Sequence, residues 1–378
     1  MGSYQYFKRY KSGKVDTLLN KKLQNVEWGK FNLEKLFGKS TRGKRLKSSD
    51  RILGTLPFVT AGEANEGISA LIGNEVTIFS ENTTTIDMFG SAKYRNYKYG
   101  GDDHIAVVHT ENLQKFASIF VTSAIHKSSY TGEFHYGRNF YAKDADELNI
   151  SLPIKNGKID FKFMENFLAE LELERIKELE SYLLASGLKD YTLTNEEKQV
   201  LEDFKSGKID FSEFKIGKLF EINTYKKRFD ANKVTISSIG EPYVVRTSLN
   251  NGVRGYIDED KQFLNEGNSI SFGQDTATMF YQEKPYFTGD KIKIVKSKDS
   301  RFNRLNGLFF ISTMTKSFSS FSWGGSSFSV NVIGNQLMKL PTKNKQPNYE
   351  LMETLISAIQ KLVIKEVVLY VDRKKQCN

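Results

Sequence analysis

The segment Trp28-Gly-Lys-Phe-Asn-Leu-Glu-Lys-Leu-Phe37 has a degenerate copy, Phe211-Ser-Glu-Phe-Lys-Ile-Gly-Lys-Leu-Phe220, 183 residues further along this 378-residue chain. Five other pairs of segments recur in the same order, at offsets between 185 and 194 residues. They are Tyr10–Asp16 with Phe204–Asp210, Pro57–Thr60 with Pro242–Val245, Phe79–Thr84 with Phe272–Ala277, Gly101–Asp102 with Gly289–Asp290, and Leu152–Pro153 with Leu340–Pro341. One or two such pairs arise by chance, but six in one order indicate two copies of the same structural unit.

Each copy ends in a stretch whose apolar residues recur at helical spacing. The first runs from about Asp160 to Ser186 and is stopped by Gly187; the second follows Pro347, a residue that a first helical turn tolerates. We expect these two amphipathic helices to pair as an antiparallel coiled coil. In the alternative, each helix packs on its own globule.

The body of each copy has the pattern of an α+β globule. Short β-rich runs are expected at 75–80, 104–109, 268–272 and 291–296, with a helix at 113–124. Trp28 and Phe31 are expected in the core. The predicted fold class is therefore α+β, with two pseudo-repeated globules that are each followed by a long helix.

Composition limits the classes of function. Lys and Arg number 55 against 45 Asp and Glu, a net charge of +10, and the segment 160–203 alone holds twelve acidic and five basic residues. The rest of the chain therefore carries +17, which favours nucleic acid as the partner of the globules. Apolar runs are too short for a membrane span, the first 25 residues lack a signal-peptide stretch, and the single cysteine, Cys377, excludes an internal disulfide. We expect a soluble, cytoplasmic protein with no membrane partner.

Several of these features together resemble a known family. The Trp28–Phe37 segment, the Leu152-Pro153 pair before a turn and a long helix, and the second copy of both look like the DNA-specificity (S) subunit of type I restriction-modification systems, or a related type IIB recognition subunit. The resemblance covers about Val26 to Val371. It implies two target-recognition domains, each of which reads one half of a split double-stranded DNA site. It also implies that the two helices separate these domains and dock DNA methyltransferase (M) subunits.

The resemblance further implies that the partner methylates adenine and binds S-adenosylmethionine, so that this chain holds no cofactor. A restriction (R) subunit is a further expected partner where the complex cleaves DNA. The expected division of the chain is an N-terminal extension (1–25), a first target-recognition domain (26–158), a first spacer helix with a connector (159–205), a second target-recognition domain (206–342) and a second spacer helix (343–378).

The sequence lacks the motifs of a catalyst. No two of its six prolines are adjacent, which excludes the Asn/Asp-Pro-Pro-Tyr/Phe loop of amino-methyltransferases. Gly38-Lys-Ser-Thr-Arg-Gly-Lys-Arg45 resembles a P-loop, but its last position holds Arg where Ser or Thr must bind Mg²⁺. We therefore predict a non-catalytic subunit without a metal site. Two alternatives stay open: a DNA endonuclease whose Mg²⁺-dependent carboxylates are not visible in the sequence, and an interaction protein such as a DNA mimic, which the basic charge disfavours.

Candidate DNA contacts are the cations, hydroxyls, amides and rings that cluster in loops. In the first domain they are Lys39, Ser40, Thr41, Arg42, Lys44, Arg45, Lys93, Arg95, His135, Tyr136 and Arg138; in the second they are Tyr225, Lys226, Lys227, Arg228, Arg246, Ser248, Asn250, Arg254, Gln274 and Trp323. Each of them has a solvated loop residue as its alternative interpretation. Candidates for the helix and partner interface are Phe167, Leu171, Leu179, Leu355, Ile359 and Leu362. Together these features predict a specificity subunit that recognises DNA sequence and recruits enzymes to it.

Overall fold

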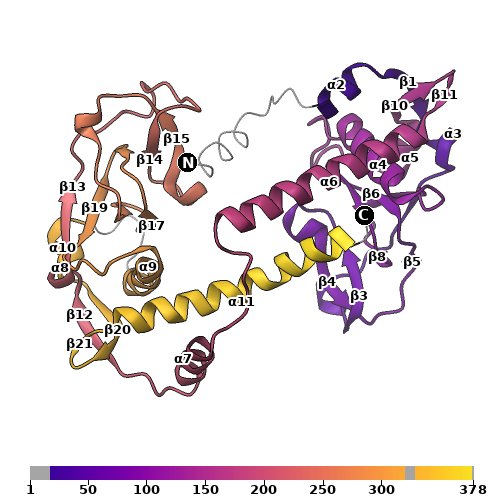
Figure 1. Ribbon diagram of the computed structural model, residues 1–378. Helices are drawn as coiled ribbons and strands as arrows, with labels where there is room; N and C mark the ends of the chain where they lie inside the picture. Colours follow the sequence, from indigo (N-terminus) through magenta and orange to yellow (C-terminus); the bar gives the residue numbers. More distant parts are fainter. Residues whose placement is uncertain (1–17, 320–327, 377–378) are drawn as a thin grey trace. The chain divides into compact units, whose positions relative to one another are not determined.

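The computed structural model describes residues 18–319 and 328–376 of the chain. The chain divides into two compact units, which we call the first unit (residues 18–177) and the second unit (residues 178–376). Figure 1 shows both, with the first unit in indigo to magenta and the second in pink to yellow. The boundary between them falls inside one long helix, α6.

The first unit is an α+β fold. Its elements are α2 (Leu18–Gln24), β1 (Glu27–Asn32), α3 (Leu33–Phe37), β2 (Thr41–Arg42), η1 (Ser48–Asp50), β3 (Leu53–Val59), η2 (Ala64–Gly67), β4 (Ile68–Ile72), β5 (Ile78–Phe79), β6 (Thr83–Asp87), β7 (Ala92–Arg95), β8 (Tyr99–Gly101), β9 (Ile105–Val108), α4 (Lys115–Ser129), α5 (Ala142–Glu147), β10 (Asn149–Lys155), β11 (Lys158–Ile159) and the start of α6 (Phe161–Ala185). The strand orders of its sheets are β2-β9-β6-β7, β4-β3-β8-β5 and β1-β10-β11. The run of β-branched residues from Thr83 to Ile86 forms the fully buried strand β6, beside the hairpin strand β7.

The second unit repeats this plan. Its elements are the end of α6, α7 (Asn195–Lys205), β12 (Phe211–Lys215), α8 (Ile216–Leu219), β13 (Phe220–Thr224), β14 (Glu241–Val244), η3 (Asn250–Gly252), β15 (Val253–Ile257), η4 (Lys261–Phe263), β16 (Ser269–Gly273), β17 (Met279–Gln282), β18 (Phe287–Thr288), β19 (Ile292–Ser297), α9 (Arg304–Phe318), α10 (Val330–Asn335), β20 (Leu337–Lys343), β21 (Gln346–Pro347) and α11 (Tyr349–Gln376). The strand orders are β13-β19-β16-β17, β15-β14-β18 and β12-β20-β21. Each sheet matches one sheet of the first unit in order and direction, except that β5 has no counterpart among the described residues of the second unit. The predicted duplication and the α+β class are therefore confirmed.

Two of the predicted segment pairs are out of register. Phe79 lies in β5 and pairs with β8, whereas Phe272 lies in β16 of a different sheet, so this predicted pair is wrong. The strand equivalent to β16 is β6, and the two begin 186 residues apart, at Thr83 and Ser269. The Gly101 and Gly289 pair is displaced by one residue, because Gly101 pairs with Val59 where Thr288 pairs with Val244.

The two units share a set of internal polar contacts, which we call the shared polar frame. The Tyr99 hydroxyl lies 2.9 Å from Thr83 Oγ1, and the Tyr286 hydroxyl lies 3.2 Å from Ser269 Oγ at the equivalent place. Tyr94 donates to Asn82 Oδ1 at 3.0 Å. Tyr281 likewise donates to Asn268 Oδ1 at 2.9 Å. The two tyrosine contacts with Thr83 and Ser269 are buried, whereas the Tyr281–Asn268 bond is exposed. The four bonds hold the sheets in the same arrangement twice, so they do not distinguish one unit from the other.

The N-terminal halves of both long helices belong to the cores of the units. Phe167 packs in the first core, with Leu171 against it, and Leu355 is buried in the second. These three were expected at the helix and partner interface. This expectation is wrong, because each globule already covers the apolar side of its long helix over these first turns. Leu179 is half-buried, while Ile359 and Leu362 are 39% and 48% exposed. Each helix therefore packs on its own globule over its first turns, as the alternative interpretation has it.

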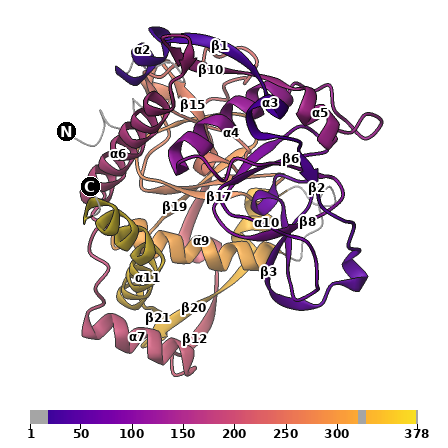
Figure 2. The ribbon, with the colours of Figure 1, turned by 90° about the vertical axis from the view of Figure 1, so that its right-hand side faces the viewer.

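The connector between α6 and β12 is not a plain linker. It forms α7, which packs against α11 (Figures 1 and 2). Glu197 of α7 is 5% exposed and accepts hydrogen bonds from Ser357 Oγ (2.7 Å) and Lys361 Nζ (2.9 Å) of α11. Lys361 also donates to the Thr192 carbonyl at 3.0 Å. A buried carboxylate thus fixes the connector to the second long helix.

The last two features of the fold concern Trp28 and the apolar character of the helices. Trp28 was expected in the core, but it is 44% exposed and stacks on Phe120 with ring centroids 6.3 Å apart. Within the residues that the structure describes, no helix combines the length and the apolar character that crossing a bilayer requires.

Candidate nucleic-acid interface

The run of cations from Lys39 to Lys47 is exposed and unpaired. Gly43 lies at its centre, where the backbone passes so close to β8 that a Cβ atom would come within 1.7 Å of the Gly101 carbonyl oxygen. The backbone N of Lys44 donates to the same oxygen at 3.1 Å. Among the described residues, no ion pair involves any of the five cations, which are Lys39, Arg42, Lys44, Arg45 and Lys47. The segment is therefore fixed at its backbone while its cationic side chains extend into solvent.

The neighbouring residues Ser40 and Thr41 bond other parts of the unit, Ser40 through its backbone and Thr41 through its hydroxyl, while the Ser40 hydroxyl is buried without a hydrogen-bond partner. The backbone N of Ser40 donates to Asp146 Oδ1 at 2.7 Å, and Thr41 Oγ1 lies 2.9 Å from His109 Nε2. These contacts tie the start of the run to α5 and to the end of β9. Ser40 and Thr41 therefore help to position the cations. They could contact a phosphate only through donor groups that these bonds leave free.

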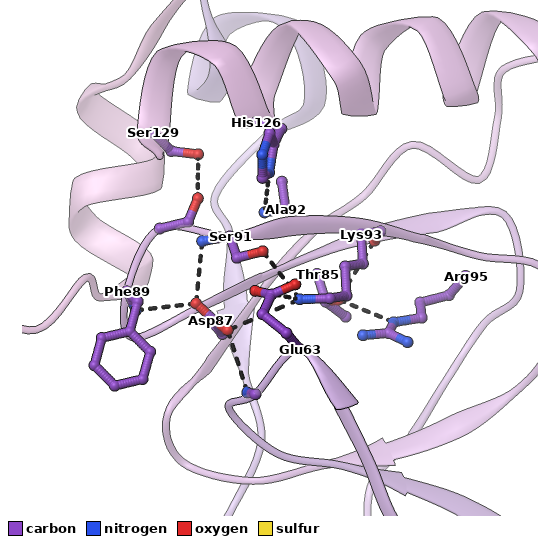
Figure 3. Close-up of polar contacts among 12 residues, drawn as sticks. Glu63, Thr85, Asp87, Phe89, Ser91, Ala92, Lys93, Arg95, His126 and Ser129 are labelled. Atoms are coloured by element: carbon purple, nitrogen blue, oxygen red, sulfur yellow. Dashed lines mark hydrogen bonds and ion pairs between the residues drawn. The ribbon is translucent and has the colours of Figure 1, made fainter. Parts of the chain in front are cut away.

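Arg95 is not a surface cation. It is 1% exposed, and its Nε donates to Thr85 Oγ1 at 2.9 Å (Figure 3). Its NH1 group donates to the Tyr97 hydroxyl at 2.9 Å. The equivalent residue of the second unit, Gln282, donates to Ser271 Oγ at 3.0 Å. Both side chains belong to the shared polar frame, so the expectation that Arg95 contacts DNA is wrong.

Lys93 is also largely covered. Its side chain is 16% exposed and its Nζ lies 3.2 Å from Glu63 Oε1, 3.0 Å from Ser91 Oγ and 3.9 Å from Asp87 Oδ2 (Figure 3). Two carboxylates therefore compensate the charge that was expected to meet a phosphate. Lys93 therefore serves to position its neighbours, in a cluster whose exposed member is Glu63.

The loop from His135 to Asn139 presents a ring and a guanidinium group. Tyr136 is 85% exposed and lies edge-on to Phe89, with centroids 5.3 Å apart. Arg138 forms an ion pair with Asp144 at 2.5 Å and lies over the Phe134 ring at 5.0 Å. His135 Nδ1 accepts a hydrogen bond from the backbone N of Gly137 at 3.1 Å, which closes the tight turn.

In the second unit, the segment after β13 carries Tyr225, Lys226, Lys227 and Arg228. Lys227 Nζ lies 4.9 Å and 4.4 Å from the centroids of the Phe229 and Phe263 rings. Lys226 is exposed and its backbone N donates to Asn265 Oδ1 at 3.1 Å. Tyr225 is half-buried beside it.

An alternating network of charges joins several second-unit candidates. Arg246 forms an ion pair with Asp275, which also pairs with Lys291 Nζ at 2.9 Å. Asp290 lies 3.8 Å from Arg246 and 3.6 Å from Arg228. Three cations and two carboxylates from four loops thus meet at one exposed place with a net charge of +1. Gln274 lies beside them, and its backbone N donates to the Lys291 carbonyl at 2.8 Å.

The remaining second-unit candidates are more scattered. Ser248, Asn250 and Arg254 are exposed in or next to the β14–β15 loop, where Asn250 Nδ2 donates to the Val253 carbonyl at 3.1 Å. Trp323 lies outside the described residues.

A set of consecutive residues in the first unit could offer ligand atoms to a metal. One atom each of Asp102, Asp103 and His104 lies within 4.8 Å of the others. His104 Nδ1 instead lies 3.3 Å from Asp103 Oδ1, and Asp102 Oδ1 accepts from the backbone N of Leu46 at 3.4 Å. Burial raises the pKa of the Asp102 carboxyl above its ordinary value. These contacts tie Asp102 to the backbone of the Lys39–Lys47 segment and place His104 beside Asp103.

Acidic residues are the part of the site that was missing from the candidate set. Asp275, Asp290 and Glu63 hold the very cations that the sequence singled out. A search for cationic clusters passes over them, because their proximity to Arg and Lys depends on loops that are distant in sequence. The only sequence signal for Asp290 is its place just after the repeated glycine.

A shared polar frame that carries different exposed loops in its two copies defines a duplicated recognition scaffold. Residues 25–181 and 208–369 each match the model of the type I restriction modification DNA specificity domain, and the chain belongs to this family. Members of the family are recognition subunits and not the catalysts of restriction-modification systems. The predicted resemblance and the predicted non-catalytic role are thereby confirmed, and the endonuclease alternative is not favoured.

Individual relatives and solved structures resemble the chain to different degrees. Over 156 residues the chain is 35% identical to the type II restriction enzyme BgcI specificity subunit S.BcgI of Heyndrickxia coagulans; the match spans 40% of this chain and 44% of that protein, less than half of its length. The S subunit of the type I restriction-modification system of M. genitalium has the same fold, with a TM-score of 0.60 over 93% of this chain and 92% of that one, at 13% identity. The HsdS subunit of Thermoanaerobacter tengcongensis aligns over 92% and 91% of the two chains at 10% identity, with a TM-score of 0.31.

Proposed function

We propose that the chain reads a bipartite site in double-stranded DNA, with one half-site for each unit, and that its helices dock methyltransferase subunits. The observation that carries this proposal is the contrast between the shared polar frame and the loops on it. The tyrosine hydroxyl contacts of the frame repeat in both units, whereas equivalent loop positions hold Ala61 in one unit and Arg246 in the other. Two copies of one scaffold with different exposed chemistry suit the recognition of two different base sequences.

The cations divide into two roles under this proposal. Lys44, Arg45 and their neighbours are exposed and form no ion pair with a carboxylate among the described residues. They therefore suit contact with DNA phosphates, which does not depend on the base sequence. Arg246 and Arg228 are held by carboxylates, which fixes the direction of each guanidinium group. A guanidinium group with a fixed direction suits the bidentate pairing with guanine O6 and N7 in the major groove.

The long helices supply the surface for the partner. Ile359, Leu362, Val363 and Tyr370 of α11 are 39%, 48%, 73% and 41% exposed, and they recur at the spacing of one helix face. Near the C-terminal ends of α6 and α11, Lys375 Nζ lies 2.8 Å from Glu180 Oε1. We propose that the C-terminal parts of the two helices pair antiparallel, as the sequence predicts; the ion pair joins them there but does not set their direction. The partner would bind S-adenosylmethionine and methylate adenine, in the cytoplasm, and a restriction subunit would join where the complex cleaves.

The test is methylation mapping of DNA from cells that carry this chain together with its methyltransferase partner. We expect methylated adenines in a split sequence, with two defined parts separated by a spacer of fixed length and free composition. A single uninterrupted site, or methylation without sequence preference, would contradict the bipartite proposal. The endonuclease alternative requires that the isolated chain cleave DNA when Mg²⁺ is added, and we expect no cleavage.

A further inference from the structure

The loop between β3 and β4 in the first unit has a close counterpart between β14 and β15 in the second. Both contain eight residues, 60–67 and 245–252. Each is closed by the same bond, from the backbone N of Thr60 to the Gly67 carbonyl and from the backbone N of Val245 to the Gly252 carbonyl, both 2.8 Å. Each ends in residues with positive φ followed by a glycine with positive φ. The residue equivalent to Glu63 is therefore Ser248, and the residue equivalent to Arg246 is Ala61.

Each loop meets the turn of a β-hairpin, and this meeting place we call the corner. In the first unit the turn joins β6 and β7, and Asp87 at its start is 4% exposed. Asp87 accepts hydrogen bonds from the backbone N atoms of Gly62 (3.3 Å), Phe89 (3.0 Å) and Ser91 (3.0 Å). One carboxylate thus holds the loop and the hairpin turn together (Figure 3).

Glu63 is the exposed group at this corner. Its side chain is 65% exposed, and its Oε1 accepts a hydrogen bond from Lys93 Nζ at 3.2 Å. Lys93, itself 16% exposed, is held in turn by Ser91 Oγ at 3.0 Å. Hydrogen bonds from Ser91 and then Lys93 keep the pKa of Glu63 below its ordinary value, so the carboxylate stays ionised and can only accept hydrogen bonds.

The corner of the second unit has the opposite character. Its loop carries Arg246, whose side chain is 31% exposed and is held by Asp275 and Asp290. At the first corner the order is reversed, because a cation, Lys93, aims a carboxylate. Two corners at equivalent places in the repeated scaffold therefore present a donor in one unit and an acceptor in the other.

We propose that Glu63 is a specificity-determining residue of the first unit, which accepts a hydrogen bond from the exocyclic amino group of a cytosine or an adenine in the major groove. This inference rests on the proposed function, in which both corners face DNA. The phosphate backbone repels a carboxylate, so the amino groups of cytosine and adenine are the DNA partners that match its chemistry in the major groove. Arg246 would meet guanine at the equivalent place in the other half-site. Lys93 and Asp87 are positioning residues for this contact.

The experiment compares Glu63→Gln with the matched control Glu66→Gln in the full complex with the methyltransferase partner. Glu66 lies in the same loop, is exposed and has no partner in the Glu63 cluster. The methylated sites of each variant are mapped, and binding is measured to duplexes that vary one base pair at a time.

We expect Glu63→Gln to relax or change the preferred base at one position of one half-site, with discrimination there falling by on the order of tenfold. The other half-site, the spacer length and binding to unrelated DNA should stay as they are, and Glu66→Gln should behave as the unaltered chain. A lysine substitution, Glu63→Lys, should abolish the preference and strengthen binding to unrelated DNA.

Unchanged discrimination in Glu63→Gln at every position would overturn the assignment of Glu63 while leaving the bipartite proposal in place. A chain that selects no split site at all would instead refute the proposed function itself. A loss of binding to all duplexes by Glu63→Gln, with an unaltered melting temperature, would also overturn the inference, because a base contact affects one position.

Discussion

The carboxylate of Glu165 in α6 accepts a hydrogen bond from the backbone N of Ala117, at the start of α4, at 2.5 Å. At the same place in the second unit, 188 residues later, Glu353 of α11 accepts a hydrogen bond from Asn306 Nδ2 near the start of α9, at 2.9 Å. In both units a glutamate of the long helix is therefore joined to the N-terminal turn of the helix on the sheet. Negative charge at this end of a helix is favourable, because its free backbone N–H groups point outward.

Glu165→Ala should lower the free energy of unfolding of the first unit by about 1 kcal/mol, since the first turn of α4 has no side-chain cap of its own. Glu165→Gln keeps an acceptor oxygen and should lose less. Denaturant unfolding followed by a probe in the first unit measures this. If Glu165→Ala and Glu165→Gln lost the same stability, the hydrogen bond to the Ala117 backbone would not be the source of the effect.

Arg95→Ala should destabilise the first unit by about 1–3 kcal/mol, because Thr85 Oγ1 and the Tyr97 hydroxyl lose a buried partner. Arg95→Gln, which places the residue of the second unit at this position, should recover part of the loss. Thermal unfolding of both variants checks this. If Arg95→Ala kept its stability and lost DNA affinity, the assignment of Arg95 to the frame would be wrong.

Arg246→Ala should reduce discrimination at one base pair of one half-site by about 1–3 kcal/mol. Lys44→Ala should weaken binding to all duplexes alike and reduce the slope of log K against log salt by about 1. Binding titrations at several salt concentrations separate these two effects. The same change in slope, with no loss of discrimination, in both variants would contradict the division of roles.

Glu197→Gln should lower the stability of the second unit by about 2 kcal/mol near neutral pH, because Lys361 loses a charged partner in a largely buried place. Burial raises the pKa of Glu197, but hydrogen bonds from Ser357, Lys361 and the backbone of Thr194 lower it further, so it lies below its ordinary value in the folded chain. The stabilisation is therefore present above the ordinary pKa and is lost as pH falls through the folded-state pKa.

Unfolding measured as a function of acid pH tests the Glu197 prediction. The difference between the unaltered chain and Glu197→Gln should be largest near neutrality and should vanish at low pH. Glu196→Gln, an exposed neighbour in α7, is the control and should show no such difference. A difference that persists below the pKa of both states would mean that the carboxylate charge is not its source.

Leu362→Asp and Ile359→Asp should leave the second unit folded, because both side chains are exposed on α11, and should prevent the methyltransferase partner from co-purifying. Leu355→Asp should instead unfold the unit, because Leu355 is 2% exposed in its core. Melting temperature and co-purification are measured together for all three. Normal co-purification of folded Leu362→Asp would remove this face from the proposed docking surface.

The duplication and the long helices followed from the sequence because they rest on periodicity and order. The helix expected over 160–186 spans Phe161–Ala185, and Gly187 adopts the positive φ that ends it. The predicted match of Phe79–Thr84 with Phe272–Ala277 is wrong because it rested on similar residue types alone. Its offset in the sequence differs from the offsets of the neighbouring pairs. Strand pairing corrected it, since β6 and β16 occupy the same place in their sheets.

The candidate site followed from the sequence only where a residue acts alone. Free cations such as Lys44 and Arg45 are exposed as expected, because a basic run in a loop has no way to bury its charges. Arg95 and Lys93 differ, because their neighbours Thr85 and Glu63 come from other strands and loops. Whether a cation is neutralised by a carboxylate depends on tertiary contacts, so the order of residues along the chain does not reveal it.

The two eight-residue loops, 60–67 and 245–252, begin and end on the same backbone bond. Because the two loops have the same length and the same closing bond, we expect either loop to fit in the other's place without disturbing the surrounding sheets. If each loop reads one half-site as proposed, exchanging the two loops would move part of the recognised sequence from one half-site to the other. A new methylation specificity could then arise by recombination within a single gene, with no new fold to be found.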